Sequence, residues 1–143
     1  MGDDRSTLKS LKTFDLATAS YGSFKAAMGQ AVRITRTPPR WKLPYVLAGS
    51  VMHLAPTWHE WHLRDDHVAF VVSYRDRMDR LGVDQIADLI QAVCPVGTAV
   101  LCCYEKLTGI PPDEQQFVCH RRVFAAWWSE NSGDEVPELE AMP

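Results

Sequence analysis

Three of the four cysteines lie in one stretch, AVLCCYEKLTGIPPDEQQFVCHRRVFAAWW, which covers residues 99–128. The last of them, Cys119, is followed directly by His120 and Arg121, where a helical pattern begins. A cysteine at a helix N-terminus lies at the positive end of the helix dipole, and neighbouring cations lower its pKa further. Cys119 is therefore the first candidate for a reactive thiolate. Arg121 and the free N–H groups of that turn are candidates for binding an anion.

The other two cysteines of this stretch end the apolar run TAVLCCY, directly before Glu105. Cys103 is the candidate partner of Cys119, either as a resolving thiol or as a second ligand. Glu105 could orient His120, and both side chains could transfer protons. The predicted catalytic set is Cys119, Cys103, Glu105 and His120.

These residues also allow a structural interpretation. Buried cysteines fill space as small apolar residues, and Arg121 could pair with Glu105 instead of binding a ligand. Cys102 alternates to the opposite face of its strand and Cys94 ends a helical pattern, so we expect both in the core. In a cytoplasmic protein the four thiols should stay reduced and not form a disulfide framework.

Four histidines between residues 53 and 67 suggest a metal site. His59 and His62 have the i, i+3 spacing that places two imidazoles on one ion. We expect Trp58 and Trp61 to mark the buried face of this segment, however, which turns both imidazoles to solvent. We therefore predict no metal ligand here and no cofactor, while a metal or cluster between the two site cysteines stays open.

The segment RITRTPPRW, residues 33–41, combines three arginines with a tryptophan on a stiff, proline-containing backbone. Such residues grip phosphates and stack bases, although the segment could equally be a solvated loop. Arg40 joins Arg121 as a predicted anion-binding residue. The predicted pocket residues are Tyr104, Trp41 and Trp58.

The patterning predicts the elements that position these residues. Residues 12–21, 30–36 and 98–104 have strand patterns, and the last is apolar throughout, as in a strand buried on both faces. Helices are expected at 56–66, 66–82 and 83–95, and from about residue 119, with Asp66 as a cap and Gly82 as a stop. This predicts an α/β fold, a small and mainly parallel sheet with helices on both faces. Sites in such sheets form at the carboxyl ends of strands, which should bring the two cysteine clusters together.

Composition fits one ordinary globular domain: 143 residues, 46% hydrophobic, 23% charged and a net charge of −3. We predict a flexible N-terminus at 1–11, a single α/β domain at 12–129 and an acidic mobile tail at 130–143. No apolar run spans a membrane, and no signal peptide is evident, so we expect a cytoplasmic protein.

The motifs LCCYEK, FVCHRRVFAAWW, LAPTWHEW and TPPRW together resemble the domain of unknown function 488 family over residues 12–128. The resemblance implies a compact α/β fold and a bacterial or phage origin. It places the family's motif on Cys103, Tyr104, Glu105, Cys119, His120 and Arg121, with Pro39, Trp41, Pro56 and Trp58 in support.

Two classes of function follow from the sequence. The first is a cysteine-centred pocket that acts on, or binds, a small anionic ligand, by thiol redox, group transfer or chemistry on a nucleotide. The alternatives are a nucleotide or nucleic-acid binding module without catalysis, and a protein-interaction factor whose cysteines are structural.

Overall fold

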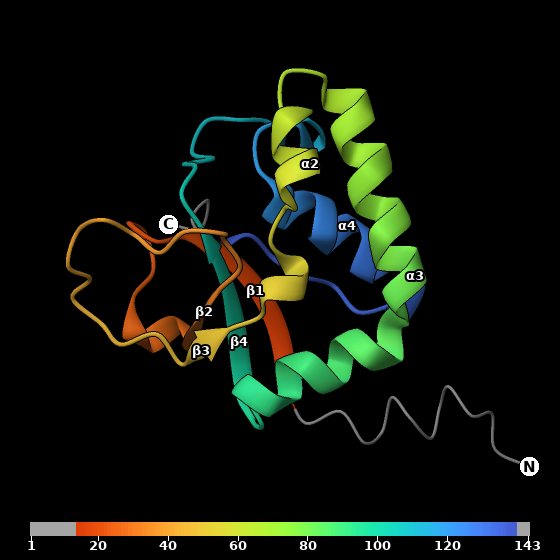
Figure 1. The fold of residues 1–143 in the computed structure, drawn as a ribbon. Coiled ribbons are helices and arrows are strands. Elements are labelled where there is room, and N and C mark those ends of the chain that lie inside the picture. The colour runs from red at the N-terminus through yellow and green to blue at the C-terminus, as the bar shows by residue number, and fades with distance from the viewer. Residues whose placement is uncertain (1–13, 140–143) are drawn as a thin grey trace, which may run out of the picture.

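The computed structural model describes residues 14–139, in which four parallel strands form one sheet in the order β1-β4-β2-β3. The strands are β1 (Phe14–Ser20), β2 (Gln30–Arg33), β3 (Gly49–Ser50) and β4 (Gly97–Cys103) (Figure 1). This confirms the predicted single-domain α/β fold with a parallel sheet. The N-terminus expected at 1–11 lies outside the described residues.

The central strand is β4, which pairs with all of β1 on one side and all of β2 on the other. Its side chains alternate between two cores. Ala99 and Leu101 face the core on the helical side, and Val100 and Cys102 face the opposite core. The unbroken apolar run is therefore explained by burial on both faces.

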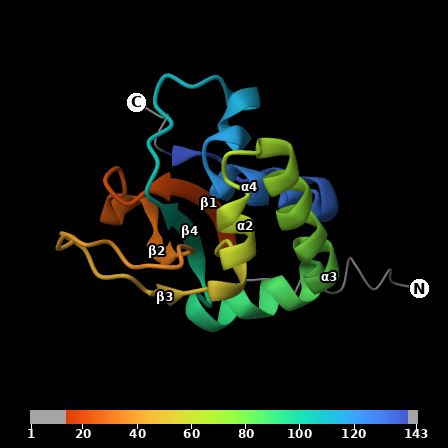
Figure 2. The ribbon, with the colours of Figure 1, turned by 45° about the horizontal axis from the view of Figure 1, so that its top comes forward.

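Two long helices cover one face of this sheet (Figure 2). They are α3 (His67–Val93) and α4 (His120–Ser132), and shorter turns are formed by η1 (Ala26–Met28), η2 (Met52–Leu54), α2 (Trp58–His62) and η3 (Pro112–Phe117). Asp66 caps α3 as predicted, because its side chain accepts a hydrogen bond of 3.1 Å from the Ala69 N–H. None of the helices described in residues 14–139 has both the length and the apolar character needed to cross a membrane.

Gly82 interrupts α3, in agreement with the predicted stop at this residue. Its φ of 82° and ψ of 158° are non-helical, and the chain resumes as a helix in a new direction (Figure 1). Two helices meeting at residue 82 were expected, and α3 consists of two helical segments that meet there at a kink. Ile86 and Ile90 after the kink are buried, so the change of direction keeps the second half of α3 on the core.

The opposite face of the sheet is covered by η1 and the proline-containing loop 37–48, so the expectation of helices on both faces is wrong. Prolines remove backbone donors and restrict the preceding residues, which keeps this loop from forming a helix. Tyr45 fastens the loop, since its hydroxyl donates a 2.6 Å hydrogen bond to the Tyr21 carbonyl and its ring packs 4.6 Å from that of Phe24.

The segment after α4 also differs from the prediction. The boundary expected after residue 129 falls within α4, which ends at Gly133 in a left-handed conformation. The chain then runs beside β1, where the Thr18 N–H donates a 2.9 Å hydrogen bond to the Pro137 carbonyl and Thr18 bridges to Glu138. Glu138 is buried, so the expected mobile tail is wrong for this part of 130–143. Residues 140–143 lie outside the described residues.

Candidate functional site

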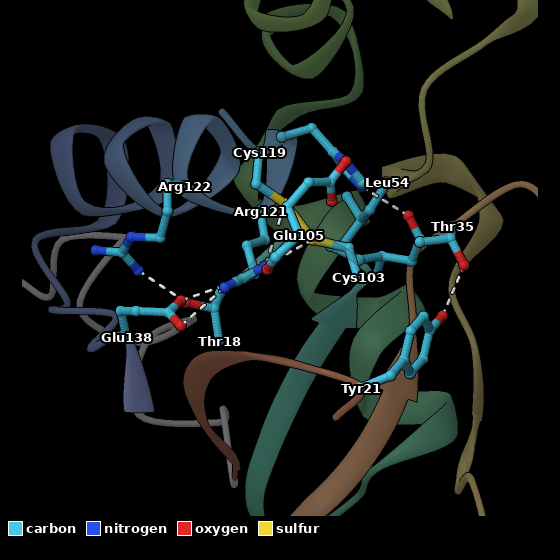
Figure 3. Close-up of a disulfide and its surroundings, with 12 residues drawn as sticks. Thr18, Tyr21, Thr35, Leu54, Cys103, Glu105, Cys119, Arg121, Arg122 and Glu138 are labelled. Carbon is cyan, nitrogen blue, oxygen red and sulfur yellow. Dashed lines mark hydrogen bonds and ion pairs between the residues drawn. A yellow bond between two sulfur atoms is a disulfide. The ribbon is translucent and has the colours of Figure 1, made fainter. Parts of the chain in front are cut away.

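The two cysteine clusters meet at the carboxyl end of β4, as predicted. Cys103 is the last residue of that strand and Cys119 is the N-cap of α4. The structure joins their sulfurs in a disulfide, which differs from the expectation of reduced thiols (Figure 3). Cys94 and Cys102 are free and buried, in agreement with their predicted core positions.

Arg121 lies behind this disulfide and is fully buried. Its Nη1 donates to the sulfurs of Cys103 and Cys119, at 3.0 and 3.3 Å, and to the Glu105 carbonyl at 2.7 Å. Its Nε and Nη2 each donate to the Glu138 carboxylate at 2.9 Å (Figure 3). The expected roles of Arg121 as a ligand-binding cation and as the ion-pair partner of Glu105 are therefore wrong. The carboxylate that pairs with Arg121 is that of Glu138, and Nη1 of Arg121 contacts the two cysteine sulfurs.

Positive charges outnumber negative charges around Glu138. Arg122 extends toward the same carboxylate, with Nη1 donating to the Thr18 hydroxyl at 2.9 Å, and that hydroxyl donates to Glu138 at 2.7 Å. Two guanidinium groups thus face one carboxylate. A single further negative charge, on a site thiolate or on Glu105, would balance this group.

Glu105 has the properties of a proton carrier. Burial raises the pKa of its carboxyl group above the ordinary value, which favours the neutral acid. Its Oε2 atom is buried and has no hydrogen-bond partner among the residues that the structure describes.

His120, which was predicted to transfer protons, is held in the neutral form, so it can accept a proton but has no ionised form to donate from at pH 7. It is buried, and burial lowers the pKa of its ring to about 4, so the ring is neutral at pH 7. Its Nε2 lies 2.7 Å from the Ile34 carbonyl. Because a carbonyl only accepts hydrogen bonds, Nε2 carries the proton and Nδ1 keeps its lone pair. The imidazole is thus held as a neutral ligand or acceptor.

A cavity of about 80 Å³, here called the cysteine pocket, opens in front of Cys119. Cys119, His120 and Glu105 line it, whereas Cys103 does not. Cys119 is therefore the sulfur that a ligand meets first. Both cysteines belong to a small apolar cluster with Leu107, against which Ile110 packs.

The rim of the cysteine pocket includes residues that sequence reasoning missed. Trp61, Arg64 and His67 line it, and the Arg64 guanidinium lies 4.6 Å from the centre of the Trp61 ring. They come from α2, the turn after it and the first residue of α3, far from the cysteines in sequence. Trp61 was expected to be buried but is 46% exposed. The turn around Glu60 explains this difference, because its buried carboxylate takes the inward-facing position of α2.

The other predicted pocket residues lie elsewhere. Trp58 is 60% exposed and does not line the cysteine pocket. Trp41 packs against Tyr104 at 6.0 Å, and the Tyr104 hydroxyl donates to the Thr37 carbonyl at 2.7 Å. Tyr104 follows Cys103 and points to the opposite side of the strand, which explains why it leaves the site. Arg40 is exposed and also does not line this pocket.

The arginines of the segment 33–41 are largely occupied by the protein's own backbone. Arg33 donates to the carbonyls of Thr35 and Arg36, at 2.9 and 2.6 Å, and Arg36 donates to the Pro56 carbonyl at 3.1 and 3.0 Å. These contacts shape the loop beside the sheet. Of the three arginines in this segment, Arg40 is the exposed one.

Comparison of the chain with protein-family models, curated proteins and solved structures finds no match. The resemblance of residues 12–128 to the domain of unknown function 488 family therefore stays a prediction. What the site does must be argued from its own geometry.

Proposed function

We propose that Cys103 and Cys119 are a redox-active pair that exchanges with a small anionic disulfide. The observation that carries this proposal is that the two sulfurs are within bonding reach and one buried guanidinium, that of Arg121, donates to both. A donor that contacts either sulfur stabilises a thiolate on each of them in turn. Two inert core cysteines would not require a buried charge beside them.

The order of the reaction follows from access. Cys119 lines the cysteine pocket, so its thiolate attacks one sulfur of the substrate disulfide and forms a mixed disulfide. The substrate thiolate that leaves takes a proton from Glu105. Cys103 then gives its proton to the Glu105 carboxylate and attacks the Cys119 sulfur. The second substrate thiolate leaves, the protein dithiol has lost two electrons, and the substrate disulfide has gained them.

Two features favour Cys119 as the attacking thiolate. It is the N-cap of α4, a helix of thirteen residues, so the residue lies at the positive end of the helix dipole. The excess positive charge of Arg121 and Arg122 over Glu138 acts in the same direction. Both effects favour the thiolate, which is the reactive form of cysteine.

The pocket rim supports an anionic substrate. The Arg64 guanidinium and the Trp61 ring provide a cation and an apolar surface at the entrance. A carboxylate-bearing disulfide could place its charge on Arg64 and its sulfurs against Cys119. In a cytoplasm, where we expect the protein, the thiol pool would return the oxidised pair to the dithiol.

The test is a trapping experiment with reduced protein and oxidised glutathione, followed by intact-mass spectrometry. Wild type should form the Cys103–Cys119 disulfide without a lasting adduct. Cys103→Ser should accumulate one glutathione adduct on Cys119, because the resolving thiol is missing. Cys119→Ser should form neither product, and Arg64→Gln should slow the first step.

Cys94→Ser is the matched control, since Cys94 is buried and remote from the cysteine pocket. It should react like wild type. Circular dichroism confirms that each variant is folded. The reference rate is the rate at which Cys94 forms a glutathione adduct in unfolded protein. If Cys119 in folded Cys103→Ser forms its adduct no faster than this, the proposed exchange function is wrong.

A further inference from the structure

Three potential metal ligands converge at the cysteine pocket. One ligating atom from each of Cys103, Cys119 and His120 lies within 4.8 Å of the other two, and all three residues are buried. Two of them come from consecutive positions at the start of α4 and the third from the end of β4. The fold therefore holds these donors together independently of any long, mobile side chain.

The hydrogen bond of His120 matches that of a metal-bound histidine. Such a residue usually donates its second ring N–H to a carbonyl or carboxylate, which fixes the ring and its tautomer. Here the Ile34 carbonyl, 2.7 Å from Nε2, has that function. The imidazole is thereby oriented with Nδ1 unprotonated, the form that binds a metal ion.

The backbone spacing also suits a shared ion. The Cα atoms of Cys103 and Cys119 lie 7.6 Å apart, whereas most disulfides span about 4.4–6.8 Å between Cα atoms. Two thiolates bound to one tetrahedral ion lie farther apart than two bonded sulfurs. A pair of cysteines at this spacing can therefore hold an ion without drawing β4 and α4 closer together.

We propose that the reduced protein binds one zinc ion through Cys103, Cys119 and His120. Two thiolates and one imidazole are a donor set that zinc prefers, and three protein ligands leave a fourth position for water or substrate. Cys119, His120 and Glu105 line the cysteine pocket, so that fourth position would open toward it. Nη1 of Arg121, which lies 3.0 and 3.3 Å from the two sulfurs, would donate a hydrogen bond to the thiolate ligands.

Zinc binding and the disulfide exclude each other, because the disulfide uses both sulfurs. Oxidation by a small disulfide converts two zinc-bound thiolates into the Cys103–Cys119 bond, with two protons taken up by the two product thiols. One zinc ion is released for each disulfide formed. The inference concerns the same cysteines as the proposed exchange function, but zinc binding does not require that exchange be fast.

The test is a titration of reduced protein with Co²⁺, a spectroscopic probe for zinc sites, without oxygen. We expect one ion per chain, with a near-ultraviolet thiolate charge-transfer band and the visible bands of a tetrahedral ion. Zinc should displace the cobalt and remove the colour. Oxidised glutathione should release zinc in proportion to the intramolecular disulfide formed.

Variants identify the ligands. Cys119→Ser should abolish the charge-transfer spectrum. Loss of a group that only hydrogen-bonds to a metal ligand weakens metal binding roughly 10- to 100-fold, so loss of the ligand itself in His120→Asn should weaken cobalt binding at least as much. Cys94→Ser and Cys102→Ala are controls that should bind like wild type. If reduced, folded wild type shows no tetrahedral cobalt spectrum, or if Cys119→Ser keeps that spectrum, the zinc proposal is wrong. Protein that traps glutathione but binds no cobalt would overturn zinc binding alone, and the reverse result would overturn exchange alone.

Discussion

Arg121 is the residue on which the site depends most. It is fully buried, and its donors connect β4, α4 and the C-terminal segment at once. A buried ion pair is costly to desolvate but far more costly to break, since breaking it leaves an unpaired charge in the core. The Arg121–Glu138 pair therefore holds the guanidinium at the two sulfurs more firmly than the sulfurs themselves could.

Removing either partner of this pair should be strongly destabilising. We expect Arg121→Met and Glu138→Gln each to lower the free energy of unfolding by about 3–5 kcal/mol, because each leaves its partner buried and unpaired. The double variant Arg121→Met/Glu138→Leu should recover much of this loss. Urea denaturation of the four proteins measures the effect, and single variants within about 0.5 kcal/mol of wild type would show that the pair is exposed in solution.

At this scale the sequence predicted part of the site. Cys103, Cys119, His120 and Glu105 could be placed together because each adjoins the end of a strand or the start of a helix. Glu138 could not be placed in the site, because it lies in an acidic segment, and such segments are usually exposed to solvent. The only signal was that Val136 and Leu139 flank it, and these apolar residues pack against the cores on the two sides of the sheet.

Among the elements, the short helix α2 is tied to α3 by the buried carboxylate of Glu60. The Glu60 carboxylate accepts hydrogen bonds of 2.8 Å from Nε and Nη2 of Arg77 on α3, and it also closes a capping box with Thr57. Sequence patterning placed the tryptophans of α2 inward because large apolar residues are usually buried. A helix of five residues has little apolar area to bury, so the ion pair decided which side faces the protein.

This contact predicts an acid-sensitive step. Burial raises the pKa of Glu60, but the hydrogen bonds from Arg77, Thr57 and Ser73 outweigh it, and the folded-state pKa lies below the ordinary 4.5. The folded protein therefore binds fewer protons than the unfolded chain near that pH. The stabilisation is complete above about 4.5 and is lost as the pH falls through the lower folded-state value.

Urea denaturation from pH 7 to pH 3 measures this loss. Part of the decline in the free energy of unfolding below about pH 4.5 should be absent in Glu60→Gln, which has no proton to gain. The control is Asp88→Asn, which removes an exposed carboxylate from α3. Identical profiles for Glu60→Gln and wild type would contradict the prediction.

For the whole molecule, the disulfide closes a segment of sixteen residues that contains η3 and the loops around it. This segment packs on α4 and carries Phe117, which lines the cysteine pocket. A cross-link stabilises a protein by restricting its unfolded chain, and the effect for a loop of this length is about 3 kcal/mol.

Reduction should therefore lower the free energy of unfolding by about 3 kcal/mol in metal-free buffer. Urea denaturation with and without reductant, in the presence of a chelator, measures the difference. Cys103→Ser should show no dependence on the reductant. Equal stability of oxidised and reduced wild type would mean that the disulfide does not form in solution.

The sequence predicted the α/β fold class, but it did not predict what covers each face of the sheet. The apolar sequence of β4 predicted a strand buried on both faces. The helical segments between strands predicted parallel pairing. The covering of the second face by loop 37–48 was not predictable, because Tyr45 and Phe24 make this cover through contacts distant in sequence.

The strand order has a consequence for synthesis of the protein. β1 and β2 are made first, but they are separated in the sheet by β4, whose residues emerge about seventy positions later. The carboxylate that neutralises Arg121 belongs to residue 138. On the ribosome, a nascent chain that has exposed β1, β2 and α3 still lacks the centre of its sheet. Once Arg121 has emerged, its guanidinium lacks its carboxylate partner until residue 138 follows.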